Sequence, residues 1–513
     1  MIQRFYKTIF LLAPLFITLS ACKEENNLPP VDPDQTFEIS LQIDLEKSRP
    51  VNRNLLGNNV QWVDNGDELI DQKTLEFKYD KVAKARKLGI SVLRYPGGSL
   101  ADLYHWQDGL GSLDQRKNNS RFHGKGQDSI RFGTTEFLTL TRTLNAEPMI
   151  TVNVITGSAE EAADWVKQTN ITRLRDAEGE LLPKVKYWEI GNEPYLIDDN
   201  QKHLAIMPED FANKANEFIK KMKQVDPSII VGIPLRSDMI AGSPATPIQG
   251  YNHRLLGSIK AEFDYVSLHN AYFPFIPGKA PEISDLYHAT LAGSQYVMED
   301  IRATQQQLKT FFPNRKPLIA ITEYSPFFTI GKGKSDGYIA SLLGALYIAD
   351  LLTTFANSND VWMANYWSLA GNWFFGAIRQ DGKLRPSYHV LEGFNRVLQG
   401  EVLSSHVKTA SFTNPKAGFV VKQSDIPFAS AVATRQGDTL TILVLNKHYS
   451  QSAKLNLNLS PNKTLTKISQ QTLSSDKAVS ADNVSIKGWS DTQAGLPDSI
   501  PARSLMIVRA KIK

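Results

Sequence analysis

A regular alternation of short apolar strands and amphipathic helices, between about residues 50 and 400, constrains the fold more than any other feature. Strand-like runs such as 54–60 and 148–154 are each followed by helical spacing, as in LEFKYDKVAKARKL at 75–88. About eight strand–helix units in succession predict a parallel sheet closed into a (β/α)8 TIM barrel over residues 51–398. An open doubly wound sheet is the alternative. The lack of a GxGxxG motif after the first strand weighs against it.

The pattern changes after about residue 400, where apolar and polar residues alternate and turn signals such as RQGD at 435–438 separate the runs. This period of two predicts strands, and residues 399–513 are expected to form a C-terminal β-sandwich. The runs lie at 416–423, 428–434, 438–446, 453–459 and 503–512. TFEISLQID at 36–44 has the same alternation, so residues 36–50 are expected to add an N-terminal strand to the sandwich. The whole chain is therefore predicted to be an α/β protein with one large and one smaller domain.

The N-terminus has the features of a signal peptide. A basic start precedes an apolar stretch that is too short to span a bilayer, and small residues follow it in LSAC at 19–22. These four residues match the bacterial lipobox, which implies that Cys22, the only cysteine, is lipidated after removal of residues 1–21. Residues 23–35 are polar and proline-rich, as expected of a tether. The alternative is a cleaved, soluble periplasmic protein in which Cys22 is incidental.

A lipid anchor places the protein in a bacterial cell envelope, and Lys23 after the cysteine favours the outer membrane. The anchor would be the only membrane contact. The net charge of +4 is spread thinly, and the one basic run, KKMK at 220–223, is expected on a polar helix face, so nucleic acid is not an expected partner. No HExxH motif or EF-hand loop occurs, so neither a metal nor a cofactor is expected.

Two carboxylates lie in YWEIGNEP at 187–194, a run that otherwise resembles a buried strand. Alternation along the strand puts Glu189 and Glu193 on one face and Asn192 on the other. Glu193 lies at the carboxyl end of the strand, where barrels place catalytic groups, whereas Glu189 lies deeper and needs a buried partner. Arg94 is a candidate partner for one of the two glutamates. The expected role of Glu189 is structural.

A third glutamate, Glu323, is predicted to close the buried strand PLIAIT at 317–322. A single glutamate at a strand end is weak evidence, because such residues often cap a helix or pair with an arginine. Two of them at the carboxyl ends of barrel strands suit cleavage of a glycosidic bond, which requires an acid and either a nucleophile or a base. Asn192 can donate to a sugar hydroxyl, and His269 and Tyr272 are placed to hold the nucleophile.

Several longer stretches resemble clan A glycoside hydrolases, and most closely the family 51 α-L-arabinofuranosidases. The stretches are LRYPGGSLADLYHWQDGLG (93–111), FGTTEFLTLTRTLNAEPMITVNVITGSAEEAADWV (132–166), YWEIGNEP (187–194), FDYVSLHNAYF (263–273) and ITEY (321–324). The resemblance runs from about residue 50 to the end. It implies a retaining glycoside hydrolase that acts on plant or algal polysaccharides or oligosaccharides by double displacement. Barrels of this type often associate into oligomers, although the sequence does not determine the oligomeric state of this chain.

The resemblance assigns roles to particular residues. Glu193 becomes the acid/base and Glu323 the nucleophile, and a neighbouring Arg94 is expected to keep Glu323 ionised while Glu193 holds its proton. Retention further predicts that the two carboxyl groups lie about 5–5.5 Å apart. The residues expected to line the sugar subsite are Arg94, Asn192, His269 and Tyr272. Aromatic side chains expected to stack on sugar faces are Trp106, Trp367 and Trp373, each of which also suits a place in the core.

The chain departs from the family where the sugar is read. An early Glu-His pair that grips arabinose hydroxyls is not found in LLGNNVQWVDN at 55–65, where Asn59 and Gln61 are the nearest polar substitutes. Ser99 follows PGG in place of Asn or Cys, and His269 and Tyr272 are one residue farther apart than in the family. A clan A hydrolase of another glycan (xylan-type, β-glucan or algal galactan) therefore stays open as an alternative. So does a glycan-binding lipoprotein without activity.

Overall fold

The computed structural model describes residues 32–121, 126–196, 206–237, 248–276, 281–330, 338–371, 375–475, 487–492 and 495–513. The signal peptide, Cys22 and most of the predicted tether lie outside these ranges. No helix among the described residues has both the length and the apolar character needed to cross a membrane.

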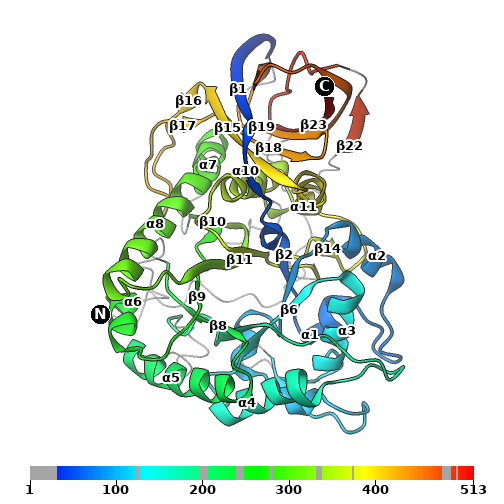
Figure 1. Cartoon of the computed structure of the whole chain (residues 1–513), viewed down its shortest axis with the longest axis vertical. Helices are drawn as coiled ribbons and strands as arrows, with labels where there is room; N and C mark the ends of the chain where they lie inside the picture. Colours follow the sequence, from blue (N-terminus) through cyan, green and yellow to red (C-terminus); the bar gives the residue numbers. More distant parts are fainter. Residues whose placement is uncertain are drawn as a thin grey trace.

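Eight parallel strands form a closed barrel, as the alternation predicted (Figure 1). They are β2 (Gly57–Asn59), β3 (Val92–Tyr95), β6 (Glu147–Val152), β7 (Tyr187–Ile190), β8 (Ile230–Pro234), β9 (Tyr265–Ser267), β11 (Leu318–Ile330) and β12 (Met363–Tyr366). Pairing of Tyr366 with Asn58 joins the last strand to the first and closes the ring. The open doubly wound sheet is thereby excluded.

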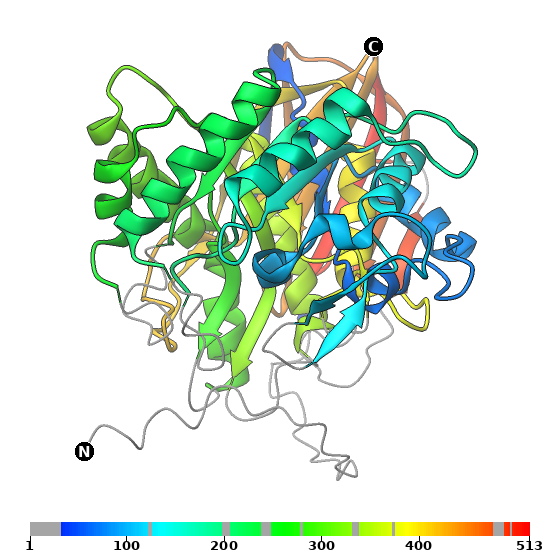
Figure 2. The same ribbon diagram turned by 90° about the horizontal axis from the view of Figure 1, so that it is seen from below.

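Helices surround the barrel (Figures 1 and 2). Their buried apolar residues belong to the same core cluster as those of the strands. The helices are α2 (Tyr79–Lys87), α3 (Thr134–Leu144), α4 (Ala159–Val166), α5 (Pro208–Val225), α6 (Tyr251–Ser258), α7 (Ile283–Leu291), α8 (Gly293–Phe311), α10 (Leu342–Asn357) and α11 (Pro386–Val397); a short turn, α1 (Val63–Glu68), follows β2. The N-cap Ser158 accepts from the Glu161 amide, as a first-turn cap should. α10 is buried along almost its whole length because it packs against both the barrel and the C-terminal sheet.

The C-terminal part is a β-rich domain built on one eight-stranded sheet in the order β20-β1-β15-β18-β19-β23-β21-β22. Its strands are β1 (Asp32–Pro50), β15 (Glu401–Thr409), β18 (Ala429–Gln436), β19 (Thr439–Asn446), β20 (Gln451–Ser460), β21 (Leu465–Ser474), β22 (Lys487–Thr492) and β23 (Ser504–Ile512). β1 comes from before the barrel and pairs antiparallel with β15 and parallel with β20. One face buries a separate apolar core that includes Ile39, Ile442 and Val508.

Three element predictions were wrong in detail. Residues 53–56 form a 3-10 turn before the short β2, because the Asn52 side chain caps them by accepting from the Asn54 amide. The run 416–423 is not a strand, since the Phe419 amide bonds instead to the Phe275 carbonyl of the barrel. β11 does not end at Glu323 but continues to Ile330, because β10 (Ala271–Ile276) pairs with the continuation.

Small pairs complete the fold: β4 (Asn118–Ser120) with β5 (Gln127–Ser129), β13 (Ala370–Gly371) with β14 (Ile378–Arg379), and β16 (Ser411–Phe412) with β17 (Ile426–Pro427). The two domains are joined by a buried ion pair between Lys447 and Asp350, at 3.1 Å. Ser430 from the sheet donates to the same carboxylate at 2.7 Å. A buried charge pair that is fully hydrogen-bonded in this way fixes the contact between α10 and the sheet.

Candidate active site

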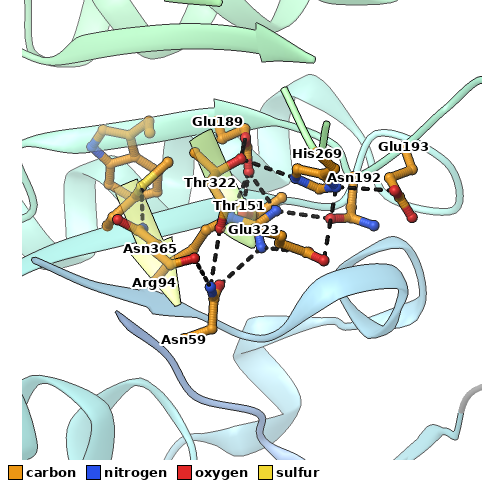
Figure 3. A network of polar contacts seen from close by, with 12 residues as sticks. Asn59, Arg94, Thr151, Glu189, Asn192, Glu193, His269, Thr322, Glu323 and Asn365 are labelled. Atoms are coloured by element: carbon orange, nitrogen blue, oxygen red, sulfur yellow. Dashed lines mark hydrogen bonds and ion pairs between the residues drawn. The ribbon is translucent and has the colours of Figure 1, made fainter. Parts of the chain in front are cut away.

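Arg94 lies at the centre of a buried polar network at the carboxyl ends of the barrel strands (Figure 3). Its Nε donates to Glu189 Oε2 at 2.7 Å, and Nη1 donates to Glu323 Oε1 at 2.9 Å. Nη2 donates to Asn192 Oδ1 at 2.8 Å. Burial alone would lower the pKa of Arg94, but the charges of Glu189 and Glu323 outweigh it and raise that pKa above its ordinary value. Arg94 is therefore a permanent cation that links two carboxylates.

Glu189 has the structural role that its depth in the strand predicted. Its side chain is fully buried, and Oε2 also accepts from the Thr151 hydroxyl at 2.8 Å. Oε1 accepts from the Thr322 hydroxyl at 3.0 Å. Burial opposes ionisation, yet the charge of Arg94 lowers the pKa of Glu189 below its ordinary value. Glu189 is thus an ionised carboxylate whose oxygens are occupied by protein donors.

Glu323 accepts a hydrogen bond on each oxygen. Oε1 accepts from Arg94, and Oε2 accepts from the Tyr272 hydroxyl at 2.6 Å. Burial raises the pKa of Glu323 above its ordinary value in spite of the nearby His269 and Arg94 charges. This differs from the expectation that Arg94 would dominate, because the whole side chain is withdrawn from water. Arg94 can only donate, so Oε1 carries no proton, and the Tyr272 hydroxyl is placed to donate to Oε2, an arrangement that favours the ionised form of a nucleophile.

Glu193 reaches the same site because the backbone turns sharply after β7. Gly191 has a φ of 74°, and a Cβ at this position would lie 2.3 Å from Val154 Cγ1, so no other residue fits. Glu193 follows with a φ of 42°. The strand alternation therefore ends at Gly191, and Asn192, predicted on the opposite face, turns inward to Arg94.

The two glutamates meet at His269. Its Nδ1 lies 3.0 Å from Glu193 Oε1 and 3.8 Å from Glu323 Oε2, so the two oxygens cannot be farther apart than the sum of these distances. Such a limit admits the separation of about 5–5.5 Å that retaining glycosidases use. The Glu193 side chain is 19% exposed and that of Glu323 5%. Glu193 is thus the carboxyl more open to an approaching leaving group.

Two predicted sugar contacts are occupied by the protein itself. The Asn59 amide donates to the carbonyls of Thr322, Asn365 and Tyr366, and its oxygen accepts from Arg94. Asn59 therefore links β2 to β11 and β12 through hydrogen bonds, whereas it was expected to bind the sugar. Trp106 is 3% exposed, stacks on Trp165 and donates its Nε1–H to the Glu161 carbonyl, which places it in the core.

The other two tryptophans have different outcomes. Trp367 follows β12 at the catalytic end of the barrel, is 6% exposed and lies against Gly98 of the PGG segment, so its contact with a sugar stays a prediction. Trp373 lies outside the described residues. Sequence reasoning missed Thr151 and Thr322, which hold Glu189, and the rings of Phe327 and Phe375 beside Tyr272. The position of Thr322 directly before Glu323 was the only available signal.

Two family models match the chain. The description "Alpha-L-arabinofuranosidase 1 domain" covers residues 84–245, which include Arg94, Asn192 and Glu193. The description "Alpha-L-arabinofuranosidase C-terminal domain" covers residues 324–488 and begins one residue after Glu323. Alpha-L-arabinofuranosidase C of Emericella nidulans is 27% identical over 419 residues, which is 77% of this chain and 80% of the relative.

The chain is an arabinofuranosidase-like glycoside hydrolase. An intracellular exo-alpha-L-arabinofuranosidase of Bacteroides ovatus is 23% identical over 424 residues, 78% of each chain. The arabinose complex of the Thermotoga maritima α-L-arabinofuranosidase superimposes on this hydrolase with a TM-score of 0.76 at 23% identity, and the match covers 93% of this chain and 100% of that one. A bifunctional glucanase-xylanase from a metagenome library shares the fold at a TM-score of 0.61 and 15% identity, over 93% and 99% of the two chains.

Proposed function

We propose that this hydrolase cleaves α-L-arabinofuranosidic bonds in plant or algal polysaccharides or oligosaccharides by double displacement. The observation that carries the proposal is the meeting of Glu193 and Glu323 at one histidine nitrogen. Glu323 attacks the anomeric carbon while Glu193 gives its proton to the leaving oxygen. Glu193 then acts as the base that takes a proton from water, and the hydroxide equivalent releases the sugar from Glu323. Arg94 and Tyr272 hold Glu323 in position for both steps.

A hydrolase of another glycan is the second candidate, and a specific observation favours it. The position where the family reads arabinose hydroxyls holds Asn59, whose amide is fully used within the protein. Clan A folds with similar barrels include a xyloglucanase from Paenibacillus polymyxa, at a TM-score of 0.60 and 14% identity. This likeness concerns the fold only. The chemistry of the two glutamates is the same for either substrate class.

A panel of substrates is expected to separate the two candidates. Purified protein should hydrolyse 4-nitrophenyl α-L-arabinofuranoside at least about tenfold faster, in kcat/KM, than the matching β-xyloside, β-glucoside or β-galactoside, a preference of roughly 1.4 kcal/mol in the transition state. Arabinan, arabinoxylan, xylan, β-glucan and agarose are assayed beside them for released sugar. A preference for any other glycoside or polymer would overturn the arabinose assignment and leave the roles of the glutamates intact.

We further propose that Cys22 is lipidated and anchors the hydrolase in the bacterial cell envelope, with the outer membrane as the favoured site. Support comes from LSAC at 19–22 and from the absence of any other cysteine in the sequence. In a Gram-negative host, wild-type protein is expected in the membrane fraction and Cys22→Ser in the soluble fraction. If the wild type is wholly soluble and Cys22→Ser does not change its location, the anchor is contradicted.

We also propose that the hydrolase associates with itself. Its molar mass in solution tests this.

A further inference from the structure

A chain of three contacts connects the structural carboxylate to the proposed acid/base (Figure 3). The Thr322 hydroxyl lies 3.0 Å from Glu189 Oε1, and the same oxygen lies 3.0 Å from His269 Nε2. On the other side of the ring, Nδ1 lies 3.0 Å from Glu193 Oε1. Glu189 lies in β7 and Glu193 just after it, His269 lies just after β9, and Thr322 lies within β11. The chain therefore runs from Glu189 to Glu193 through one hydroxyl and one imidazole.

The direction of the first two hydrogen bonds follows from the ionised state of Glu189. A carboxylate held by Arg94 and Thr151 is an acceptor only, so the Thr322 hydroxyl must donate its single proton to it. The Thr322 oxygen can then only accept from the ring. His269 must therefore carry a proton on Nε2, since an unprotonated Nε2 would face the lone pairs of that oxygen.

Among the residues that the structure describes, the second ring nitrogen has ion-pair contacts with two carboxylates, Glu193 and Glu323. The titratable and charged groups around His269 are Arg94 from β3, Glu189 and Glu193 from the end of β7, and Glu323 and Tyr272 from β11 and β10. Burial lowers the pKa of His269, but the two acids beside Nδ1 outweigh it and raise that pKa above its ordinary value. Nδ1 can therefore donate to ionised Glu193 or, when neutral, accept from protonated Glu193.

We propose that Glu189 and Thr322 are positioning residues that hold His269 with its proton on Nε2, so that Nδ1 and Glu193 share one further proton. This proposal rests on the proposed function, since it concerns the proton that Glu193 delivers. In the first step the shared proton passes from Glu193 to the leaving oxygen. In the second step Glu193 takes a proton from the attacking water and the pair is restored. No other proton donor is needed.

Replacement of Thr322 by valine removes the acceptor without changing the shape of the side chain. The imidazolium loses a hydrogen bond from Nε2, and the neutral ring is free to move its proton to Nδ1, so His269 and Glu193 release their shared proton more readily. The basic limb of the pH profile of kcat/KM is expected to move to lower pH by about one to two units, the equivalent of one hydrogen bond to a charged group. Thr322→Ser retains the hydroxyl and is expected to restore the wild-type limb.

Thr151→Val is the matched control, because Thr151 donates to the same carboxylate at 2.8 Å but does not contact the ring. Whether or not Thr151→Val reduces the rate, the basic limb of its pH profile of kcat/KM is expected to stay at the wild-type pH. An unmoved limb in Thr322→Val, or equal displacements in both valine variants, would overturn the proposal.

A measurement without substrate keeps the two proposals separable. In protein labelled with ¹⁵N-histidine, the His269 ring is identified by comparison with His269→Gln, and its two nitrogen shifts report where the proton resides. The wild type and Thr322→Ser are expected to show a protonated Nε2 across the pH range, and Thr322→Val a ring that loses this preference at high pH. A neutral ring protonated on Nδ1 in the wild type would contradict the proposal even if the enzyme is active. If the His269 ring is protonated on Nε2 as expected but the enzyme is inactive, the proposed function is contradicted and the proposal on His269 is not.

Discussion

Replacement of Glu323 by alanine is expected to reduce kcat/KM by about four orders of magnitude or more on every substrate, because no other group can form the glycosyl–enzyme bond. Azide added to this variant should enter the space left by the carboxylate and attack the anomeric carbon directly. The product is then a glycosyl azide of inverted configuration. The configuration is determined by NMR of the isolated product.

Glu193→Ala is expected to behave differently, because it removes only the proton donor and base. A substrate with a dinitrophenolate leaving group needs little protonation and should still form the glycosyl–enzyme. Hydrolysis of that intermediate then stalls, so a burst of dinitrophenolate should precede a slow steady state. Azide should relieve the stall and give a product of retained configuration, since a second inversion follows the first.

The matched control is Glu161→Ala. Glu161 lies near the same end of the barrel and pairs with His105 at 3.1 Å, outside the network around Arg94. This variant is expected to retain activity close to that of the wild type. If Glu193→Ala and Glu323→Ala respond alike to leaving group and azide, the assignment of acid and nucleophile is wrong. If both keep wild-type rates, the two carboxylates have no part in the reaction.

Arg94→Met is expected to have the largest effect on stability. It leaves the Glu189 and Glu323 carboxylates buried without their shared cation, which typically costs about 3–5 kcal/mol in the free energy of unfolding. Denaturant unfolding followed by tryptophan fluorescence measures the loss. Arg94→Met combined with Glu189→Gln should lose less, because one of the two stranded charges is then neutral.

The pH dependence of this loss has a defined sign. In the wild type, the pKa of Glu189 is lowered by Arg94, so its contribution to stability is present above its ordinary pKa and declines as the pH falls. Without Arg94, burial raises the pKa of both carboxyls, and protonation removes their unpaired charges. The difference in free energy of unfolding between Arg94→Met and the wild type should therefore become smaller toward acidic pH. Arg116→Met is the control. It breaks a buried ion pair outside the site, in which Arg116 Nη2 lies 2.7 Å from Glu136 Oε1, so it should lower stability yet leave activity in the folded protein. An Arg94→Met protein as stable as the wild type would contradict the central role of Arg94.

The periodicity of the sequence was enough to predict the barrel. Strands followed by helices leave few arrangements other than a closed parallel sheet, and the carboxyl ends of such strands meet at one end. Glu193 and Glu323 are 130 residues apart in number, yet the strand-end positions predicted for both placed them at the same end of the barrel, although β11 continues past Glu323 to Ile330. The need of a buried carboxylate for a partner likewise predicted that Arg94 would contact a glutamate.

The hydrogen-bond partners of the polar side chains were determined by the tertiary structure alone. Asn59 and Trp106 have side chains suited to a sugar, but partners from distant strands and helices occupy their polar atoms. Asn192 faces Arg94 only because the positive φ of Gly191 ends the strand alternation one residue earlier. The role of Thr322 depends on its contacts with Glu189 in β7 and with His269 just after β9. The local pattern predicts which end of the barrel a residue occupies, whereas the partners of its polar atoms are backbone and side-chain groups 53 to 263 residues away, which only the fold brings close.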